Sequence, residues 1–117
     1  DKKEYSILEF DAFLSGKVKE VLRQSLVKSK AIEHYILVNN NNFIPYFKQN
    51  SILGLRQVSG FDNMGKYLVI KEGKVMLVIT KNNKEKNVTG FIFPNFYTPI
   101  DVDSLVAKTY KILLVCH

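Results

Sequence analysis

Residues 34–47 read HYILVNNNNFIPYF, and they predict a β-hairpin. The apolar runs on both sides of the asparagines are rich in residues that favour strands. Residues 39–42 suit the turn, because asparagine tolerates a left-handed backbone better than other non-glycine residues do. Pro45 cannot donate a hydrogen bond to a neighbouring strand, so we expect the second strand to lie at a sheet edge or to be broken there.

The segment before this hairpin, from Glu4 to about Lys30, has the pattern of a long helix. Gly16 interrupts the pattern and predicts a kink or two shorter helices, with Ser15 capping the second. Such a helix could pack on a sheet, or could also pair with a second copy of the chain, and the sequence leaves both open. Its apolar residues recur every three or four positions: Ile7, Phe10, Leu14, Val18, Val21, Leu22 and Leu26.

The segment after the hairpin begins with an irregular part and continues with a part that has the pattern of strands. Residues 49–65 contain three glycines and no lasting period, which predicts loops with one or two short helical turns. Residues 66–81 predict two strands around a turn, with Gly73 at its tight position. We expect a third strand at 87–96, a short helix capped by Asp101 or Asp103, and a last strand at 109–117.

These elements predict an α+β fold, in which a long N-terminal helix packs on a five- or six-stranded antiparallel sheet. A chain of 117 residues is long enough for a core of its own, so we expect one domain over residues 1–117. No apolar run reaches the roughly 18 residues that a membrane-spanning helix needs. The chain begins at Asp1 rather than Met, which is typical of an excised domain or a processed product. If it is an excised domain, membrane segments could flank it.

The charge and the single cysteine limit the partners. The formal net charge is +6, but the basic residues are scattered along the chain and only Arg23 and Arg56 are arginines. Arginine is the residue preferred for phosphate and base-edge recognition, so we expect no nucleic-acid partner. Cys116 has no second cysteine with which to form a disulfide, and we expect its thiol to be buried in the last strand.

Groups for catalysis or metal binding do not form a recognisable pattern. The two histidines, His34 and His117, are far apart, and Cys116-His117 lacks the spacing of a zinc site. No phosphate-binding loop is present, and Asp101 and Asp103 suit helix capping better than acid–base chemistry. We therefore expect neither an enzyme nor a cofactor, and no metal. The eight Phe and six Tyr are mostly core residues, although aromatics with polar tips also line small-molecule pockets.

One resemblance gives these aromatics a role. Residues 32–42, followed by Phe43-Ile44-Pro45 and Asn50-Ser51, resemble the hairpin region of PAS and Cache sensor domains. Tyr46, Phe47 and Lys48 stand where one chemoreceptor subgroup of that family has His-Asn. The resemblance implies a five-stranded antiparallel sheet with helices on one side and a ligand pocket between the sheet and residues 49–65.

The resemblance further implies a small-molecule sensing domain of a bacterial signal-transduction receptor, such as a chemoreceptor. We expect it to be periplasmic or, as an alternative, cytoplasmic, and a homodimer through the N-terminal helix is possible. A profilin-like or longin-like protein-interaction module without a ligand shares the element order and stays open. The expected ligand-binding residues are Tyr35, Phe43, Tyr46, Phe47, Arg56, Phe61, Tyr67, Phe91, Phe93 and Tyr97.

Overall fold

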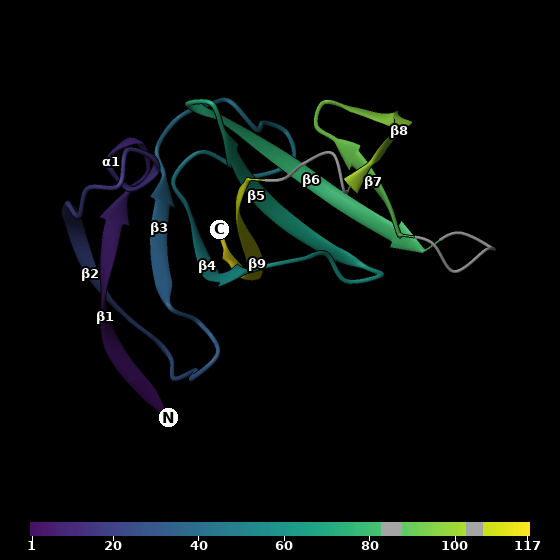
Figure 1. Ribbon diagram of the computed structural model, residues 1–117. Coiled ribbons are helices and arrows are strands. Elements are labelled where there is room, and N and C mark those ends of the chain that lie inside the picture. The colour runs from purple at the N-terminus through teal and green to yellow at the C-terminus, as the bar shows by residue number, and fades with distance from the viewer. Residues whose placement is uncertain (83–87, 103–106) are drawn as a thin grey trace. The chain divides into compact units, whose positions relative to one another are not determined.

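The computed structural model describes residues 1–82, 88–102 and 107–117, and almost all of its regular structure is β-sheet (Figure 1). The prediction of an α+β fold with a long N-terminal helix is therefore wrong. The elements are β1 (Lys2–Glu9), α1 (Phe10–Leu14), β2 (Glu20–Val27), β3 (His34–Val38), β4 (Ser51–Val58), β5 (Gly65–Lys71), β6 (Lys74–Asn82), β7 (Val88–Ile92), β8 (Asn95–Asp101) and β9 (Lys108–Cys116).

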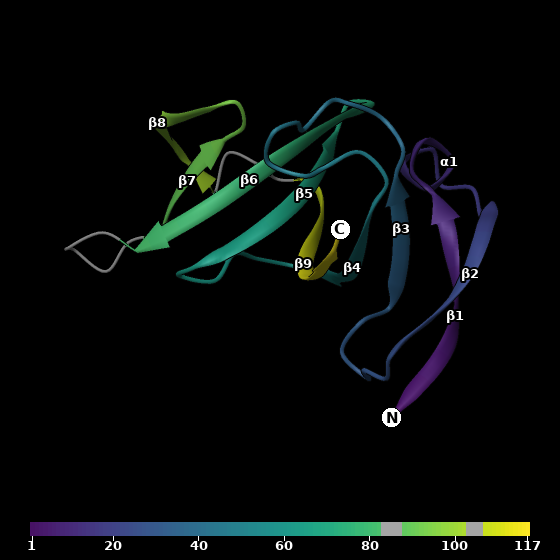
Figure 2. The ribbon, with the colours of Figure 1, turned by 180° about the vertical axis from the view of Figure 1, so that it is seen from behind.

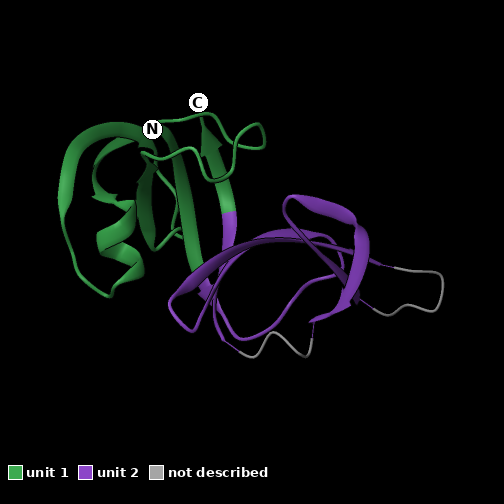
Figure 3. Ribbon diagram, turned by 90° about the horizontal axis from the view of Figure 1, so that it is seen from above, with its two compact units in different colours: residues 1–56, 113–117 green, residues 57–112 purple. Residues whose placement is uncertain are grey.

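The strands follow the order β2-β1-β3-β4-β9-β5-β6-β7-β8 and form a mixed sheet. β1 and β3 pair parallel. The pairs β1–β2, β3–β4, β5–β6, β5–β9, β6–β7 and β7–β8 are antiparallel. The chain divides into two compact units (Figure 3): residues 1–56 with 113–117, and residues 57–112. The prediction of one domain over 1–117 stays a prediction, and each unit is described by itself below.

In unit 1, residues 4–30 form a hairpin instead of the predicted helix. β1 and β2 lie side by side, and the five-residue α1 follows β1 (Figures 1 and 2). Gly16 has a φ of 78°, a left-handed conformation that glycine adopts without strain, and the chain turns back there. The helical spacing failed as a signal because the same apolar residues also suit a strand pair, in which Ile7 lies opposite Leu22.

The predicted hairpin at 34–47 is half wrong. β3 is a strand, but it pairs with β1 and β4 rather than with residues 43–47. The asparagines lead into a series of turns, in which the Asn40 side-chain oxygen accepts the backbone N–H of Asn42 at 3.1 Å. Pro45 lies among these turns and not in an edge strand. The aromatic rings of Phe43 and Phe47 are buried, so this segment packs by its side chains instead of by strand pairing.

The segment at 49–65 is only in part the irregular region that was predicted, because only residues 49–50 and 59–64 lie outside strands. Residues 51–58 form β4, and its first five residues are all buried. The residues that were expected to cover the sheet are thus a strand of the sheet. One core cluster of unit 1 consists of Ile7, Leu26, Tyr35 and Ile52, with Tyr5, Leu22, Ile32, Leu37, Leu114 and Cys116 partly buried around it.

In unit 2, two of the elements predicted from short-range sequence patterns are confirmed. The strand pair at 66–81 is confirmed as β5 and β6, with Gly73 at a φ of 76° in the turn. The last strand is confirmed as β9. The third predicted strand, at 87–96, is instead divided between two strands, β7 and β8, which pair with each other. Asp101 is the last residue of β8, and residues 103–106 of the predicted short helix, with the alternative cap Asp103, lie outside the described residues.

Candidate protein-interaction edge

The aromatic residues predicted to bind a ligand in unit 1 mainly form its interior. Phe43 stacks edge-on with Phe47 at a centroid distance of 6.2 Å, and Phe47 meets Tyr46 at 4.9 Å. Arg56 is exposed, and its guanidinium donates to the Ala31 carbonyl at 3.2 Å. These contacts indicate that the aromatic side chains pack against one another and that Arg56 anchors a loop.

Tyr35 is the unusual member of this group. Its side chain is 4 % exposed, and its hydroxyl has no hydrogen-bond partner. The centroid of its ring lies 4.5 Å from that of Tyr5. The two hydroxyls nevertheless do not have the geometry of a hydrogen bond. Burial, with a smaller contribution from Tyr5, raises the pKa of Tyr35 above its ordinary value.

The predicted residues of unit 2 are dispersed between core and surface. Tyr67 is fully buried and packs edge-on against Phe61 at 4.9 Å. Its hydroxyl accepts the backbone N–H of Asp62 at 2.7 Å, and Lys111 forms an ion pair with the Asp62 carboxylate. The hydrogen bond to Asp62 raises the pKa of Lys111. This cluster anchors the loop before β5.

The other three predicted residues of unit 2 do not gather either. Phe91 lies under the Lys81 ammonium group, 5.6 Å from its ring centroid, and Phe93 contacts Phe96 at 5.8 Å. Tyr97 is 93 % exposed on β8. The predicted site residues therefore do not converge within either unit.

A serine and a histidine do approach each other, at Ser51 and His117. Ser51 Oγ lies 3.0 Å from His117 Nδ1, but the Ser51 hydroxyl also donates to the Lys48 carbonyl at 2.6 Å. The oxygen therefore accepts from the imidazole, which is the reverse of what an activated nucleophile needs. Ser51 is also fully buried, so this pair is structural.

Metal and membrane features can be stated for the described ranges only. Across residues 1–82, 88–102 and 107–117, no three His, Cys, Asp or Glu side chains gather where they could hold a metal ion. The same residues form no helix with the length and apolar character to cross a bilayer.

The feature of unit 1 that is best suited to binding another molecule is the free edge of β2. β2 ends the strand order and pairs with β1, so its other side has no partner strand among the described residues. It is eight residues long and contains no proline. A strand edge of this kind presents unpaired backbone N–H and C=O groups. Its two valines are exposed, Val21 by 39 % and Val27 by 67 %, and so is Val18 shortly before it, by 83 %.

A bulge determines which side chains of β2 share a face. Leu22 lies opposite Ile7, but Glu20 lies opposite Leu8, so Val21 is an extra residue between the two pairs. The shift brings Glu20 onto the same face as Arg23, although they are three positions apart. Leu22 and Leu26 lie on the other face, where they join the core of unit 1.

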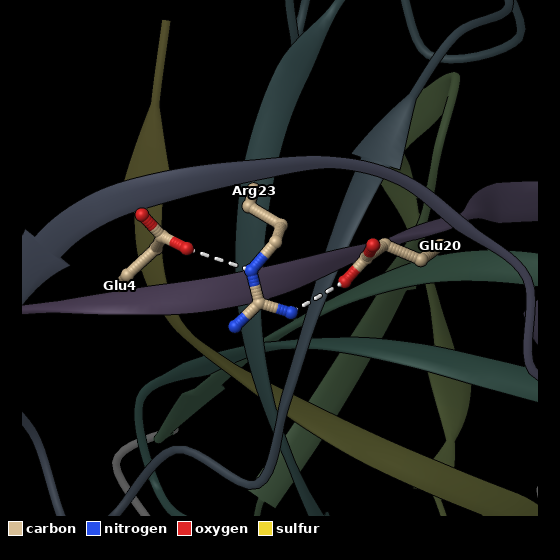
Figure 4. A network of polar contacts seen from close by, with 3 residues as sticks. All are labelled: Glu4, Glu20 and Arg23. Carbon is tan, nitrogen blue, oxygen red and sulfur yellow. Dashed lines mark hydrogen bonds and ion pairs between the residues drawn. The ribbon is translucent and has the colours of Figure 1, made fainter.

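Arg23 is neutralised on its face by two carboxylates (Figure 4). Its Nε donates to Glu4 at 2.7 Å, and Nη1 donates to Glu20 at 2.9 Å. These bonds, with that to Glu4 as the largest cause, raise the pKa of Arg23. The pKa of Glu20 is lowered by the Ser6 hydroxyl and then by Arg23. This network holds the Arg23 guanidinium over the sheet face. Its charge therefore does not oppose the pairing of another strand with the open edge.

The other terminal strand, β8, is a poorer docking edge. Pro99 lies within it, opposite Phe91, and has no N–H to offer to a further strand. The Asn95 side chain also bonds locally, because its oxygen accepts the Tyr97 N–H at 3.0 Å. A proline is a common means of protecting an edge from unwanted pairing. The edges thus differ, and β2 is the one without this protection.

Sequence reasoning missed the β2 edge because it assigned residues 20–27 to a helix. A signal was available in the same segment: Gly16 with the β-branched Val18, Val21 and Val27 is more typical of a turn and a strand.

No protein-family model matches the chain, and neither the curated proteins nor the solved structures provide a match. The geometry of the chain is thus the basis for a functional proposal.

Proposed function

We propose that the chain is a protein-interaction module that adds an extended segment of a partner to the free edge of β2. The observation that supports this is an eight-residue, proline-free terminal strand with exposed valines beside it. In strand addition, backbone hydrogen bonds provide the affinity, and alternate side chains provide the specificity. This is the interaction class that the sequence left open, without its profilin-like or longin-like fold.

The two faces of β2 define what the added segment must present. On one face, Leu22 and Leu26 continue the apolar core, so the segment needs apolar residues at alternate positions. On the other face, Arg23 is already paired with Glu4 and Glu20, so a segment with polar, weakly charged residues suits it. The expected partner is therefore an amphipathic strand.

The test is a selection of short random peptides displayed on phage, followed by amide chemical shifts of the purified chain. Binding should perturb residues 18–27. Val21→Lys combined with Val27→Lys should weaken binding at least about tenfold, because lysine on an edge opposes pairing. Tyr97→Lys on β8 is the matched control and should bind as the unaltered chain does. Peptides that bind the valine variant equally well would contradict the proposal.

The sensor hypothesis from the sequence stays a prediction. It relied on a long helix and a covering middle segment, and the corresponding residues are the strands β1, β2 and β4. We therefore favour interaction over small-molecule sensing and its periplasmic setting. A thermal-shift screen against amino acids, organic acids, purines and haem addresses it directly, because a ligand that binds the folded chain raises its melting temperature.

A further inference from the structure

We infer that the segment added to β2 is an extended peptide with an acidic residue at one end, and that its carboxylate lies opposite Lys28. This inference rests on the proposed function, because it names the chemistry of the partner at the same edge. The dimer through an N-terminal helix cannot form, since the residues expected in that helix form a hairpin and α1.

The backbone of β2 alternates between groups that face β1 and groups that face the open edge. The Lys28 N–H donates to the Asp1 carbonyl at 3.1 Å, so the backbone of Lys28 faces β1. In a regular antiparallel pair, successive residues point their N–H and C=O groups to opposite sides. Arg23, Ser25 and Val27 therefore present these groups at the open edge, where a partner strand can pair with them.

The bulge at Val21 sets the length of the segment that this edge can pair. The register with β1 is regular from Leu22 to Val27, and it shifts between Leu22 and Glu20. A bulge interrupts the alternation of backbone groups and often terminates pairing. The regular edge thus runs over residues 22–28.

One face of this edge carries two apolar positions and one charge. Leu22, Gln24, Leu26 and Lys28 share the core face, because alternate residues of a strand point to the same side. Opposite each of them, an antiparallel partner forms a non-hydrogen-bonded pair, in which the facing side chains are closest. Apolar partner residues suit the two leucines, and a carboxylate is the complementary group at Lys28.

The charge around Lys28 is unbalanced. Residues 1–3 and 27–30 contain four lysines and one aspartate. Lys28 is exposed, and within residues 1–82, 88–102 and 107–117 no carboxylate forms an ion pair with it, although Asp1 lies across from it. Opposite charges on facing strand positions stabilise a pair, and like charges destabilise it. This end of the edge therefore favours an acidic residue and disfavours a basic one.

The other face of the edge does not have this preference. Arg23 is already paired there with Glu4 and Glu20. Val27 also lies on that face, so its neighbour in the added segment should be apolar although Lys28 is adjacent in the chain. The preference for a carboxylate is therefore specific to the position opposite Lys28.

The experiment measures the Kd of a synthetic peptide and its charge variant for the whole chain, from the amide chemical shifts of residues 22–28. The peptide is EVITTTI, acetylated and amidated, and its glutamate lies opposite Lys28 in the antiparallel register. Replacing this glutamate by lysine should raise the Kd about threefold to tenfold. Lys28→Glu should raise the Kd of the glutamate peptide by a similar factor and lower that of the lysine peptide.

Lys17→Glu is the matched control, because it makes the same charge change at the other end of the β1–β2 hairpin. β2 alone has eight residues and is roughly 26 Å long. The Debye length at physiological salt is only about 8 Å, so the control should leave the Kd of both peptides unchanged. Circular dichroism should show that both variants keep their strands.

The failure of this inference can be told apart from that of the proposed function. If the unaltered chain binds both peptides equally, or if Lys28→Glu changes neither Kd, the acidic end is overturned, while shift changes at residues 22–28 still support strand addition. The acidic end is also overturned if EVITTTI does not bind and selected peptides without an acidic residue bind at these residues. A chain that binds neither EVITTTI nor any selected peptide at β2 overturns both proposals.

Discussion

At the residue scale, two buried tyrosines differ in how their hydroxyls are satisfied. The Tyr67 hydroxyl accepts the Asp62 N–H, whereas the Tyr35 hydroxyl has no partner. A buried polar group without a hydrogen bond costs free energy that a paired one does not. The same substitution should thus have opposite consequences at the two positions.

Tyr67→Phe should lower the free energy of unfolding by about 1 to 3 kcal/mol, because it leaves the Asp62 N–H unpaired. Tyr35→Phe removes an unpaired hydroxyl and should be neutral or stabilising by up to about 1 kcal/mol. Urea unfolding of both variants measures the difference. A Tyr35→Phe variant that loses as much stability as Tyr67→Phe would mean that the Tyr35 hydroxyl has a partner in solution.

Glu9 gives a pH-dependent prediction at the same scale. Its carboxylate accepts the backbone N–H groups of Asp11 at 2.7 Å and Ala12 at 3.0 Å, at the start of α1. These bonds, with that to Asp11 as the largest cause, lower the pKa of Glu9 from its ordinary 4.5. A carboxyl group with a lowered pKa in the folded state stabilises the fold above its unfolded pKa.

Glu9→Ala should therefore cost about 0.5 to 2 kcal/mol at neutral pH, as the loss of a helix cap does. The difference from the unaltered chain should shrink as the pH falls below 4.5 and through the lower folded pKa. Urea midpoints across an acid pH series measure this. A gap between the two proteins that stays constant with pH would count against the cap.

At the element scale, the β5–β6 hairpin is defined by its turn. Glu72 has a φ of 52° and Gly73 a φ of 76°, so two consecutive residues are left-handed. This is the backbone of a two-residue turn that matches the twist of its strands and favours Asn-Gly. Glu72 is thus a strained choice at the first turn position.

Glu72→Asn should stabilise the chain by about 0.5 to 1 kcal/mol, because asparagine adopts a left-handed backbone more readily than glutamate. Gly73→Ala should destabilise it by about 1 to 2 kcal/mol, for the opposite reason. Thermal unfolding of both variants measures the direction. Equal effects of the same sign would show that the turn changes its conformation in solution.

At the scale of the whole molecule, two units with separate apolar clusters share two strands. β4 (Ser51–Val58) and β9 (Lys108–Cys116) each contain residues of both units. A strand cannot easily remain ordered at one end when the other end unfolds. We therefore expect the two units to unfold together.

Truncation of one large core residue in each unit tests this cooperativity. Ile52→Ala in unit 1 and Leu77→Ala in unit 2 should each cost about 2 to 5 kcal/mol, because both side chains are buried. Amide hydrogen exchange should show that either variant lowers the protection of both units. Loss of protection confined to the altered unit would indicate independent units.

The sequence by itself predicted little of the candidate site. The aromatics chosen as ligand contacts were selected by residue type, and residue type does not distinguish a core ring from a pocket ring. In the structure, Phe43, Phe47 and Tyr67 are buried core residues. The β2 edge was missed because an edge is a property of strand order, which depends on pairings between distant segments.

The sequence alone determined the elements whose information is local. The β5–β6 hairpin was predictable because its two strands adjoin and its turn carries its own glycine. The last strand was predictable because its β-forming run is nine residues long and uninterrupted. Only the tertiary structure decided that residues 4–30 form a hairpin and α1 rather than a long helix. Their apolar spacing suits either form, and the parallel pairing of β1 with β3 is available only when they are extended.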